Sequence, residues 1–206
     1  MKKFIPLFFI FFLSKSYAFD VTTLFDHLVK QGVPSHALKA ALEGYAWALQ
    51  KGQVRNKKYL TVVDFSLPST SKRMWVIDVN RGKVIYNELV AHGKGSGSGN
   101  MATRFSDRSG SDASVLGVII TENAYFGKHG HSLRLTGLEH INYKVRVRAI
   151  VVHPAAYATS AFARAYGYLG HSWGCFALDP RISNQIINII KNGSVLFAYA
   201  KNLPHI

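Results

Sequence analysis

The sequence predicts a fold that is mainly β with α, in which a short helical N-terminal segment precedes a β-rich domain. Before residue 52, apolar side chains recur at helical spacing, whereas from Tyr59 onward short runs rich in Val, Ile and aromatic residues are bounded by Gly, Pro, Asn or Ser. Several short strands at this spacing favour a mainly antiparallel arrangement. Hydrophobic residues make up 48% of the chain, which argues against disorder.

The first eighteen residues have the pattern of a secretory signal peptide. Two lysines follow Met1, residues 4–13 are almost entirely apolar, and Ser16 and Ala18 place small side chains at the −3 and −1 positions of a cleavage site. The apolar run is too short to span a bilayer comfortably, and a retained N-terminal anchor is the alternative. We therefore expect an exported protein, periplasmic or secreted, without stable membrane insertion after cleavage.

Two helices are expected in the N-terminal segment. Thr22 or Thr23 is the expected cap of the first helix, Gly32 ends it, and Pro34 opens the second. The charged stretch 51–58 that follows has the composition of a linker.

Each predicted strand is a short β-branched or aromatic run with turn residues at both ends. Arg81 and Gly82 fall between two such runs and predict a tight hairpin turn. Near the C-terminus a helix is expected over residues 182–191, ended by Asn192 and Gly193. The predicted strands are 59–65, 73–79, 83–90, 116–121, 145–152 and 194–199. The expected organisation is a signal peptide at 1–18, a helical segment with its linker at 19–58, and a β-rich domain at 59–206.

The chain carries 25 Lys and Arg residues against 11 Asp and Glu residues, a formal net charge of +14. A basic exported protein meets anionic surfaces such as cell-wall polymers or lipid headgroups. The cations are scattered, and none of the known DNA- or RNA-binding motifs is present. We expect weakly specific affinity for a polyanionic matrix and no nucleic-acid partner.

Cys175 is the single cysteine, so no internal disulfide is possible. Exported proteins usually pair their cysteines or lack them, because the compartment oxidises thiols. A lone exported thiol is therefore buried, paired between chains or chemically active, and composition leaves these three options open. The residues around Cys175 favour the third.

The segment 171–177, with the sequence His-Ser-Trp-Gly-Cys-Phe-Ala, has the features of a nucleophile loop. A thiol attacks as the thiolate, which needs a nearby imidazole or a field of backbone N–H groups. Gly174 lets the chain turn tightly, so that the amides of Gly174 and Cys175 can point at a developing oxyanion. A helix is expected soon after Pro180, which places the thiol on a loop, where catalytic groups usually stand.

Two histidines are candidates for the base. His153 ends a predicted strand, and its Nδ1–H can bond a backbone carbonyl while Nε2 takes the thiol proton. His171 is only four residues from Cys175, but closeness in sequence does not guarantee hydrogen-bond reach. The residues favour His153 slightly and leave His171 open.

Val151, Val152 and His153, followed by Ser-Trp-Gly-Cys at 172–175, resemble the paired motif of murein L,D-transpeptidase catalytic domains. In that family a strand-end histidine precedes a Ser-x-Gly-Cys loop. The resemblance covers residues 59–201, approximately, and the further segments that carry it are 90–97, 105–106, 110–111, 116–117, 125–130 and 133–138.

The resemblance implies a β-sandwich or barrel catalytic domain that uses neither metal nor cofactor. In the family, the cysteine attacks the L,D peptide bond after the third residue of a peptidoglycan tetrapeptide stem, D-alanine leaves, and a thioester forms. An amine of a second stem peptide, or of a protein acceptor, then resolves the thioester. Position by position, the resemblance implies Cys175 as nucleophile, His153 as base, and Gly174 with Cys175 as the oxyanion hole.

Four further residues are expected to contact substrate: Ser172, which is the motif serine, and Trp173, His171 and His92. Many relatives carry a histidine where this chain has Trp173, and a Gly or Ser where it has Pro154. The Pro154 carbonyl can still orient an imidazole. Trp173 is expected either to pack in the core or to form a platform beside the substrate.

Several alternatives stay open. Water could resolve the same thioester, which would make the chain an L,D-carboxypeptidase or cross-link hydrolase, or the thiol could be inert in a non-catalytic wall-binding module. A papain-like peptidase is disfavoured, because there the cysteine precedes its histidine. His129 and His131 have a spacing found in some zinc sites, but a third ligand is not evident, so a turn is expected. The glycine-rich stretch 93–99 lacks the phosphate-loop ending and is expected to be a mobile active-site loop or a linker.

Overall fold

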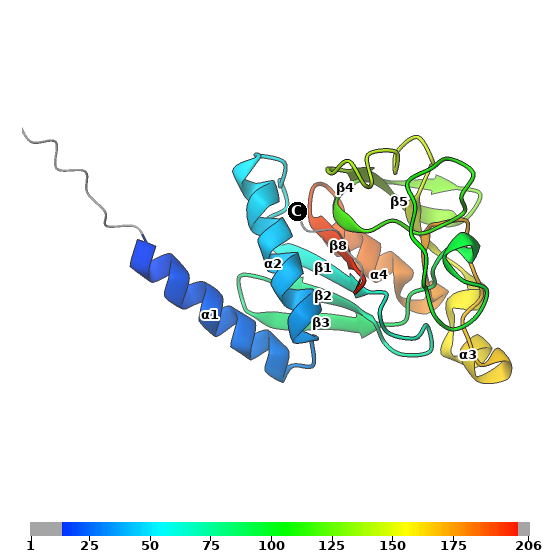
Figure 1. Cartoon of the computed structure of the whole chain (residues 1–206), viewed down its shortest axis with the longest axis horizontal. Coiled ribbons are helices and arrows are strands. Elements are labelled where there is room, and N and C mark those ends of the chain that lie inside the picture. Colours follow the sequence, from blue (N-terminus) through cyan, green and yellow to red (C-terminus); the bar gives the residue numbers. More distant parts are fainter. Residues whose placement is uncertain (1–13, 202–206) are drawn as a thin grey trace, which may run out of the picture.

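The computed structural model describes residues 14–201, and Figure 1 shows a curved sheet with α2 crossing one face and α4 lying on the other. The apolar run of the predicted signal peptide lies outside the described residues, and the expected cleavage site falls in the first turns of α1. Across residues 14–201, every helix is too short or too polar to traverse a lipid bilayer. The helices and strands, in chain order, are α1 (Ser14–Lys30), α2 (Ser35–Gln50), β1 (Tyr59–Asp64), β2 (Met74–Asp78), β3 (Lys83–Glu88), η1 (Lys94–Ser96), β4 (Gly117–Gly127), β5 (Gly130–Gly137), β6 (Val151–Pro154), η2 (Ala156–Ala158), α3 (Ser160–Tyr166), β7 (Phe176–Leu178), α4 (Pro180–Ile190) and β8 (Val195–Tyr199).

Eight strands form a single sheet in the order β3-β2-β1-β8-β4-β5-β6-β7. Neighbouring strands are antiparallel except for β1 with β8 and β6 with β7, which run parallel. The predicted fold class, mainly β with α, is confirmed. The expected hairpin turn joins β2 to β3, where the Arg81 N–H donates to Asp78 Oδ1 at 3.1 Å and Gly82 has a φ of 58°.

The helix α2 packs directly on the sheet through its small residues. A Cβ at Gly44 would lie 2.8 Å from both Phe197 and Val118, so only glycine permits this close approach. The linker that follows is also held in place, because the Tyr45 hydroxyl donates to the Lys57 carbonyl at 2.7 Å. The helical segment therefore shares a hydrophobic core with the strands β1, β2, β4 and β8. The expected domain boundary at residue 59 stays a prediction.

The helix α4 covers the other face of the sheet with Ile186, Ile187 and Ile190, all fully buried. It begins at Pro180, two residues before the predicted start, because the Asp179 side chain caps it by accepting from the Arg181 N–H at 2.9 Å. The helix ends before Asn192 and Gly193, both of which have positive φ.

Some expectations for the chain were wrong. Neither Thr22 nor Thr23 starts a helix, because α1 begins at Ser14 and runs through both. The expected strand 145–152 is mostly a series of turns, and only Val151 and the next three residues form β6. Its alternation of Val and Arg imitates a strand, but Ala149 has a φ of 51°, which breaks the extended backbone. The elements β5, β7 and α3 were not predicted.

Candidate active site

The loop that carries Cys175 is held by a short network of hydrogen bonds. The Ser172 N–H donates to the His92 carbonyl at 3.0 Å, and the Lys94 N–H donates to the Ser172 carbonyl at 2.9 Å. The Ser172 hydroxyl donates to the Cys175 carbonyl at 2.7 Å and accepts from the Gly174 N–H at 3.2 Å. Ser172 is 2% exposed, so it holds the loop together, and its expected contact with substrate is not supported.

Gly174 is required by the backbone at this point. Its φ is 109°, and a Cβ would lie 2.7 Å from the Ala113 carbonyl oxygen. This part of the sequence prediction is confirmed. However, the Gly174 N–H is already bonded to Ser172, so it is not free to bind an oxyanion. Of the two amides expected to form the oxyanion hole, that leaves the Cys175 N–H.

His153 lies in β6, and Cys175 lies in the loop directly before β7, the parallel strand that pairs with β6. The ladder between the two strands pairs Val152 with Phe176 and His153 with Ala177. The backbone N–H of Val151 acts on the sulfur of Cys175. The strand pairing therefore places the thiol beside Val151, two residues before His153 in the same strand.

The imidazole of His153 is oriented by a hydrogen bond to the backbone of the next residue. Its Nδ1 lies 2.9 Å from the Pro154 carbonyl oxygen, which confirms the expected backbone hydrogen bond. Since a carbonyl only accepts, Nδ1 carries the proton and Nε2 keeps its lone pair. In this structure the thiol of Cys175 lies 3.8 Å from the Ala149 carbonyl, to which it donates.

Burial sets the charge of both groups. It raises the pKa of the Cys175 thiol, against which the Val151 N–H and the cations Arg148 and Lys128 act in the opposite direction. Burial also lowers the pKa of His153, the hydrogen bond to the Pro154 carbonyl raises it, and the neighbouring His129 and Lys128 lower it further. At neutral pH both the thiol and the imidazole are therefore neutral in the resting state.

Two residues near the thiol were not identified from the sequence. Arg148 donates to the carbonyls of Ser106 and Ala113, at 2.6 Å each, and its side chain is 5% exposed. Tyr157, in η2, has its pKa raised to about 12 by burial and by the neighbouring Cys175. Arg148 was read as one of many scattered cations, and only the fold places it behind the nucleophile loop.

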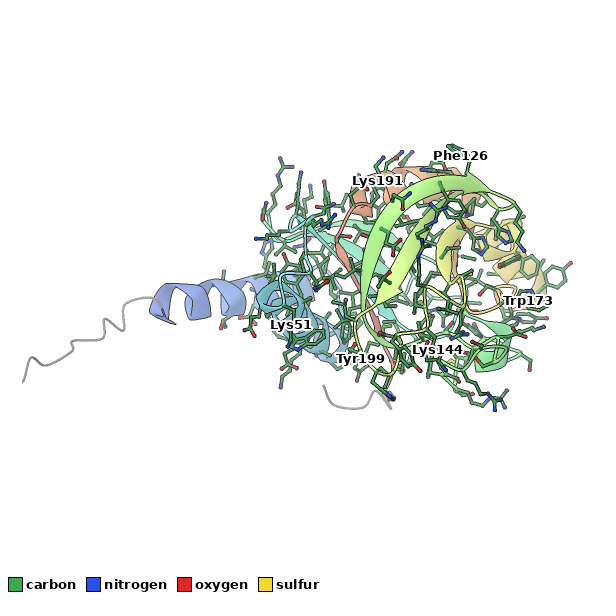
Figure 2. The ribbon with its side chains drawn as sticks, turned by 90° about the horizontal axis from the view of Figure 1, so that it is seen from above. Lys51, Phe126, Lys144, Trp173, Lys191 and Tyr199 are labelled. Atoms are coloured by element: carbon green, nitrogen blue, oxygen red, sulfur yellow. The ribbon has the colours of Figure 1, made fainter. Side chains whose placement is uncertain are left out.

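Trp173 projects from the loop, and Figure 2 shows it at the end of the domain opposite α1. Its side chain is 70% exposed, which excludes the core-packing alternative. The Lys94 Nζ lies 3.7 Å from the centre of its ring, and the same ammonium is 3.2 Å from Asp112. Trp173, two residues before the nucleophile in the same loop, therefore presents an exposed aromatic ring next to a cation.

His92 does not lie as the sequence suggested, whereas the expected contact of His171 with substrate stays a prediction. His92 is fully buried, its Nδ1 accepts from Arg73 at 2.9 Å, and its Nε2 donates to the Gly97 carbonyl at 3.2 Å. Its pKa is lowered to about 3, first by burial and then by Arg73 and His171. His92 is a structural residue, so the expected substrate contact is wrong. His171 is half-buried, and its Nε2 is 3.0 Å from the Gly99 carbonyl.

The glycine-rich stretch 93–99 is not a linker, because it packs against the nucleophile loop. Gly93 forms a β-bridge with Ser172, and a Cβ at Gly93 would lie 2.7 Å from the backbone of Gly174. Among residues 14–201 there is no group of three or more His, Cys, Asp or Glu residues placed to hold a metal ion. The turn expected around His129 is present, but His131 already lies in β5.

The fold and the site together define a β-rich domain with a histidine on one strand of the sheet and a cysteine in the loop that leads into the neighbouring strand. Residues 29–199 match the family model of the L,D-transpeptidase catalytic domain, and the chain belongs to this family. No curated protein sequence matches the chain significantly.

Among solved structures, the chain is similar to L,D-transpeptidases from three bacteria. For the Mycobacterium smegmatis protein the identity is 15% and the TM-score 0.45, over 69% of this chain and 59% of that one. For the Stackebrandtia nassauensis protein the identity is 15% and the TM-score 0.42, over 71% of this chain and 58% of that one. For the Xylanimonas cellulosilytica protein the identity is 13% and the TM-score 0.42, over 75% of this chain and 68% of that one. The chain thus spans less than two thirds of the length of the first two.

Proposed function

We propose that the protein is a peptidoglycan L,D-transpeptidase that works through a thioester on Cys175. The observation that carries this proposal is that Cys175 directly precedes β7 and has its thiol beside Val151 of the paired strand β6, which also carries His153 with its Nδ1 held by the Pro154 carbonyl. Membership of the L,D-transpeptidase catalytic-domain family supports it.

Acylation begins when the thiol turns from the Ala149 carbonyl toward His153, a rotation about one side-chain bond. Nε2 of His153 takes the thiol proton, and the sulfur attacks the carbonyl carbon of the L,D peptide bond in a tetrapeptide stem. The Cys175 N–H is the loop amide available to the resulting oxyanion. When the intermediate collapses, the carbon–nitrogen bond breaks, D-alanine leaves with the proton from the imidazolium, and a thioester remains.

Deacylation reverses these roles. The amine of an acceptor gives a proton to Nε2 of His153 and attacks the thioester carbonyl, and the sulfur leaves as the thiolate, which the imidazolium then protonates. The positive charge of Arg148 stabilises the thiolate at both stages, since it lowers the pKa of Cys175. A second stem peptide or a protein is the proposed acceptor.

The surroundings of the thiol suit a peptide substrate with carboxylates. The exposed ring of Trp173 offers a stacking surface, and Lys94 beside it offers a positive charge. The formal net charge of +14 favours residence on an anionic polymer. With the signal-peptide pattern at residues 1–18, these features favour export to the periplasm or beyond the cell.

The test is to incubate the protein with peptidoglycan that contains tetrapeptide stems, digest it, and weigh the products by mass spectrometry. Wild type is expected to form new cross-links between third residues, or to exchange D-alanine for an added D-amino acid, and Cys175→Ala is expected to form neither. Stems shortened by one residue without new links would identify water as the acceptor instead. Unchanged stems with the wild type would point to the non-catalytic wall-binding alternative.

A further inference from the structure

The hairpin between β4 and β5 places a second histidine against His153. The rings of His129 and His153 are stacked, with their centres 4.4 Å apart and their planes 27° from parallel. His129 comes from a different part of the chain from both His153 and Cys175. No step of the proposed reaction uses it.

The hairpin is built to hold His129 in this position. Gly127 pairs with Gly130, so Lys128 and His129 form a two-residue turn, the tightest connection that antiparallel strands allow. The turn lies over the end of β6, since a Cβ at Gly130 would be 3.8 Å from the Pro154 ring. On the outer side of the same hairpin, Phe126 is 84% exposed, and Figure 2 shows it at the edge of the molecule.

The stacking contact fixes the orientation of the His153 ring plane, which the hydrogen bond to Pro154 alone does not fix. An imidazole held only through Nδ1 can still swing about that bond, and Nε2 then loses its aim at the sulfur. A second ring lying flat on the first restricts this motion, because tilting would break the stacked contact. Together the Pro154 carbonyl and the His129 ring fix both the tautomer and the plane of His153.

We propose that His129 is a positioning residue for His153, which aims Nε2 at Cys175 and shields the imidazole from water. This inference rests on the proposed function, because it assigns His153 the role of base. It also makes the turn formed by Lys128 and His129 part of the active site rather than a plain connection.

The same contact adjusts the charge of the base. Burial lowers the pKa of His153, and the neighbouring His129 and Lys128 lower it further. A base must be neutral to accept a proton, so a lowered pKa keeps His153 active at a lower pH than an ordinary histidine would allow. Around the thiol, Arg148 and Lys128 act on Cys175, and Cys175 acts on Tyr157. Behind it, Asp107 and Asp112 act on Arg148.

The variants His129→Ala and His129→Phe separate the possible roles, and His131→Ala is the matched control. Phenylalanine keeps a flat ring of similar size but cannot carry charge, whereas alanine removes the ring. His131 lies two residues away on the same hairpin and stacks on Phe126, with centres 5.1 Å apart, rather than on His153.

Two measurements are made on each variant. The first follows the His153 ring by NMR of protein carrying isotope-labelled histidine, which gives its pKa without any substrate. The second is the pH profile of kcat for peptide exchange. Because NMR needs no turnover, an inactive wild type would refute the proposed function and still leave the positioning of His153 testable.

His129→Ala is expected to raise the pKa of His153, move the acid limb of the kcat profile to higher pH, and lower kcat at its optimum by about 10- to 100-fold. His129→Phe is expected to restore kcat to within about threefold of wild type, since stacking and shielding return. His131→Ala should match wild type in both measurements. An unchanged His153 pKa in His129→Ala, or equal loss of kcat in the alanine and phenylalanine variants, would overturn the proposal.

Discussion

The Ser172 hydroxyl donates a hydrogen bond of 2.7 Å to the carbonyl of Cys175, three residues further along the chain. The same oxygen accepts from the Gly174 N–H at 3.2 Å, so one buried side chain closes the whole nucleophile loop. The serine of the Ser-x-Gly-Cys motif therefore acts on the backbone. Its effect on catalysis is to fix where the sulfur and the Cys175 N–H point.

Replacing Ser172 by Ala should impair both stability and turnover. The change leaves the Gly174 N–H and the Cys175 carbonyl without their partner, which costs about 1–3 kcal/mol of unfolding free energy. kcat should fall by about 10- to 100-fold because the loop loses its fixed geometry, while KM changes little. Denaturant unfolding and steady-state kinetics measure the two effects. Ser183→Ala, at a buried serine in α4, is the control, and equal kcat in both variants would contradict the role of Ser172.

Gly174→Ala should abolish activity. A Cβ there would lie 2.7 Å from the Ala113 carbonyl and 3.1 Å from Arg148, at a φ of 109° that L-residues rarely adopt. Gly99→Ala is the matched control in a neighbouring loop, since its Cβ would meet no atom within 4 Å. The alkylation rate of Cys175 by iodoacetamide, together with circular dichroism, checks both variants. A Gly174→Ala protein that is as reactive as Gly99→Ala would show that the loop conformation is not needed.

Arg148→Met should make the thiol harder to ionise. Arg148 lowers the pKa of Cys175, so its removal should raise that pKa. Alkylation of the thiol at neutral pH should then slow, and the midpoint of the alkylation rate plotted against pH should move to higher pH. Unfolding free energy should also drop, because the carbonyls of Ser106 and Ala113 lose a buried donor. Arg146→Met removes a half-exposed cation nearby and should leave the midpoint in place. Identical midpoints in the two variants would refute the electrostatic role.

Trp173→Ala should weaken substrate binding and leave the fold intact. The ring is 70% exposed, so the unfolding free energy should change by less than about 0.5 kcal/mol. The loss of a stacking partner should raise KM for a stem peptide by about 2- to 10-fold. Tyr166→Ala, at a 60% exposed aromatic residue in α3, is the control. If the two variants have the same KM, Trp173 is not a substrate platform.

Stability should depend on the neutral form of His92. Its pKa is lowered to about 3 in the folded protein from an ordinary 6.5, so between these values the unfolded chain binds the extra proton. The contribution of His92 is therefore fully present above pH 6.5 and is lost as the pH falls toward 3. Urea unfolding at several pH values should show this loss in wild type and a shallower slope in His92→Gln. Parallel slopes would mean that His92 is not the titrating group.

Much of the fold follows from local chemistry that the sequence displays. Pro34 opens α2, Asp179 caps α4, and Gly82 completes a hairpin, and each of these works within a few residues of chain. The prediction of a strand over 145–152 was wrong because no local signal marks the break. Nothing in its alternating Val and Arg residues indicates the positive φ of Ala149.

The site was predicted in part. The hydrogen bond from His153 to the Pro154 carbonyl and the need for glycine at 174 could be anticipated, because both depend on neighbours in sequence. Two other contacts could not be anticipated: the hydrogen bond between Arg73 and the buried His92, and the stacking of His129 on His153. Each of them joins residues about 20 positions apart, which only the folded chain brings together. Whether the predicted residues carry out the chemistry stays a prediction.

The account depends on His153 activating Cys175, and intact-mass measurement after exposure to imipenem tests this most directly. Since the chain has one cysteine, any thiol adduct is on Cys175. Wild type should gain a single adduct, Cys175→Ala none, and His153→Ala should react at least about 100-fold more slowly. A His153→Ala protein that is acylated at the wild-type rate would contradict the account.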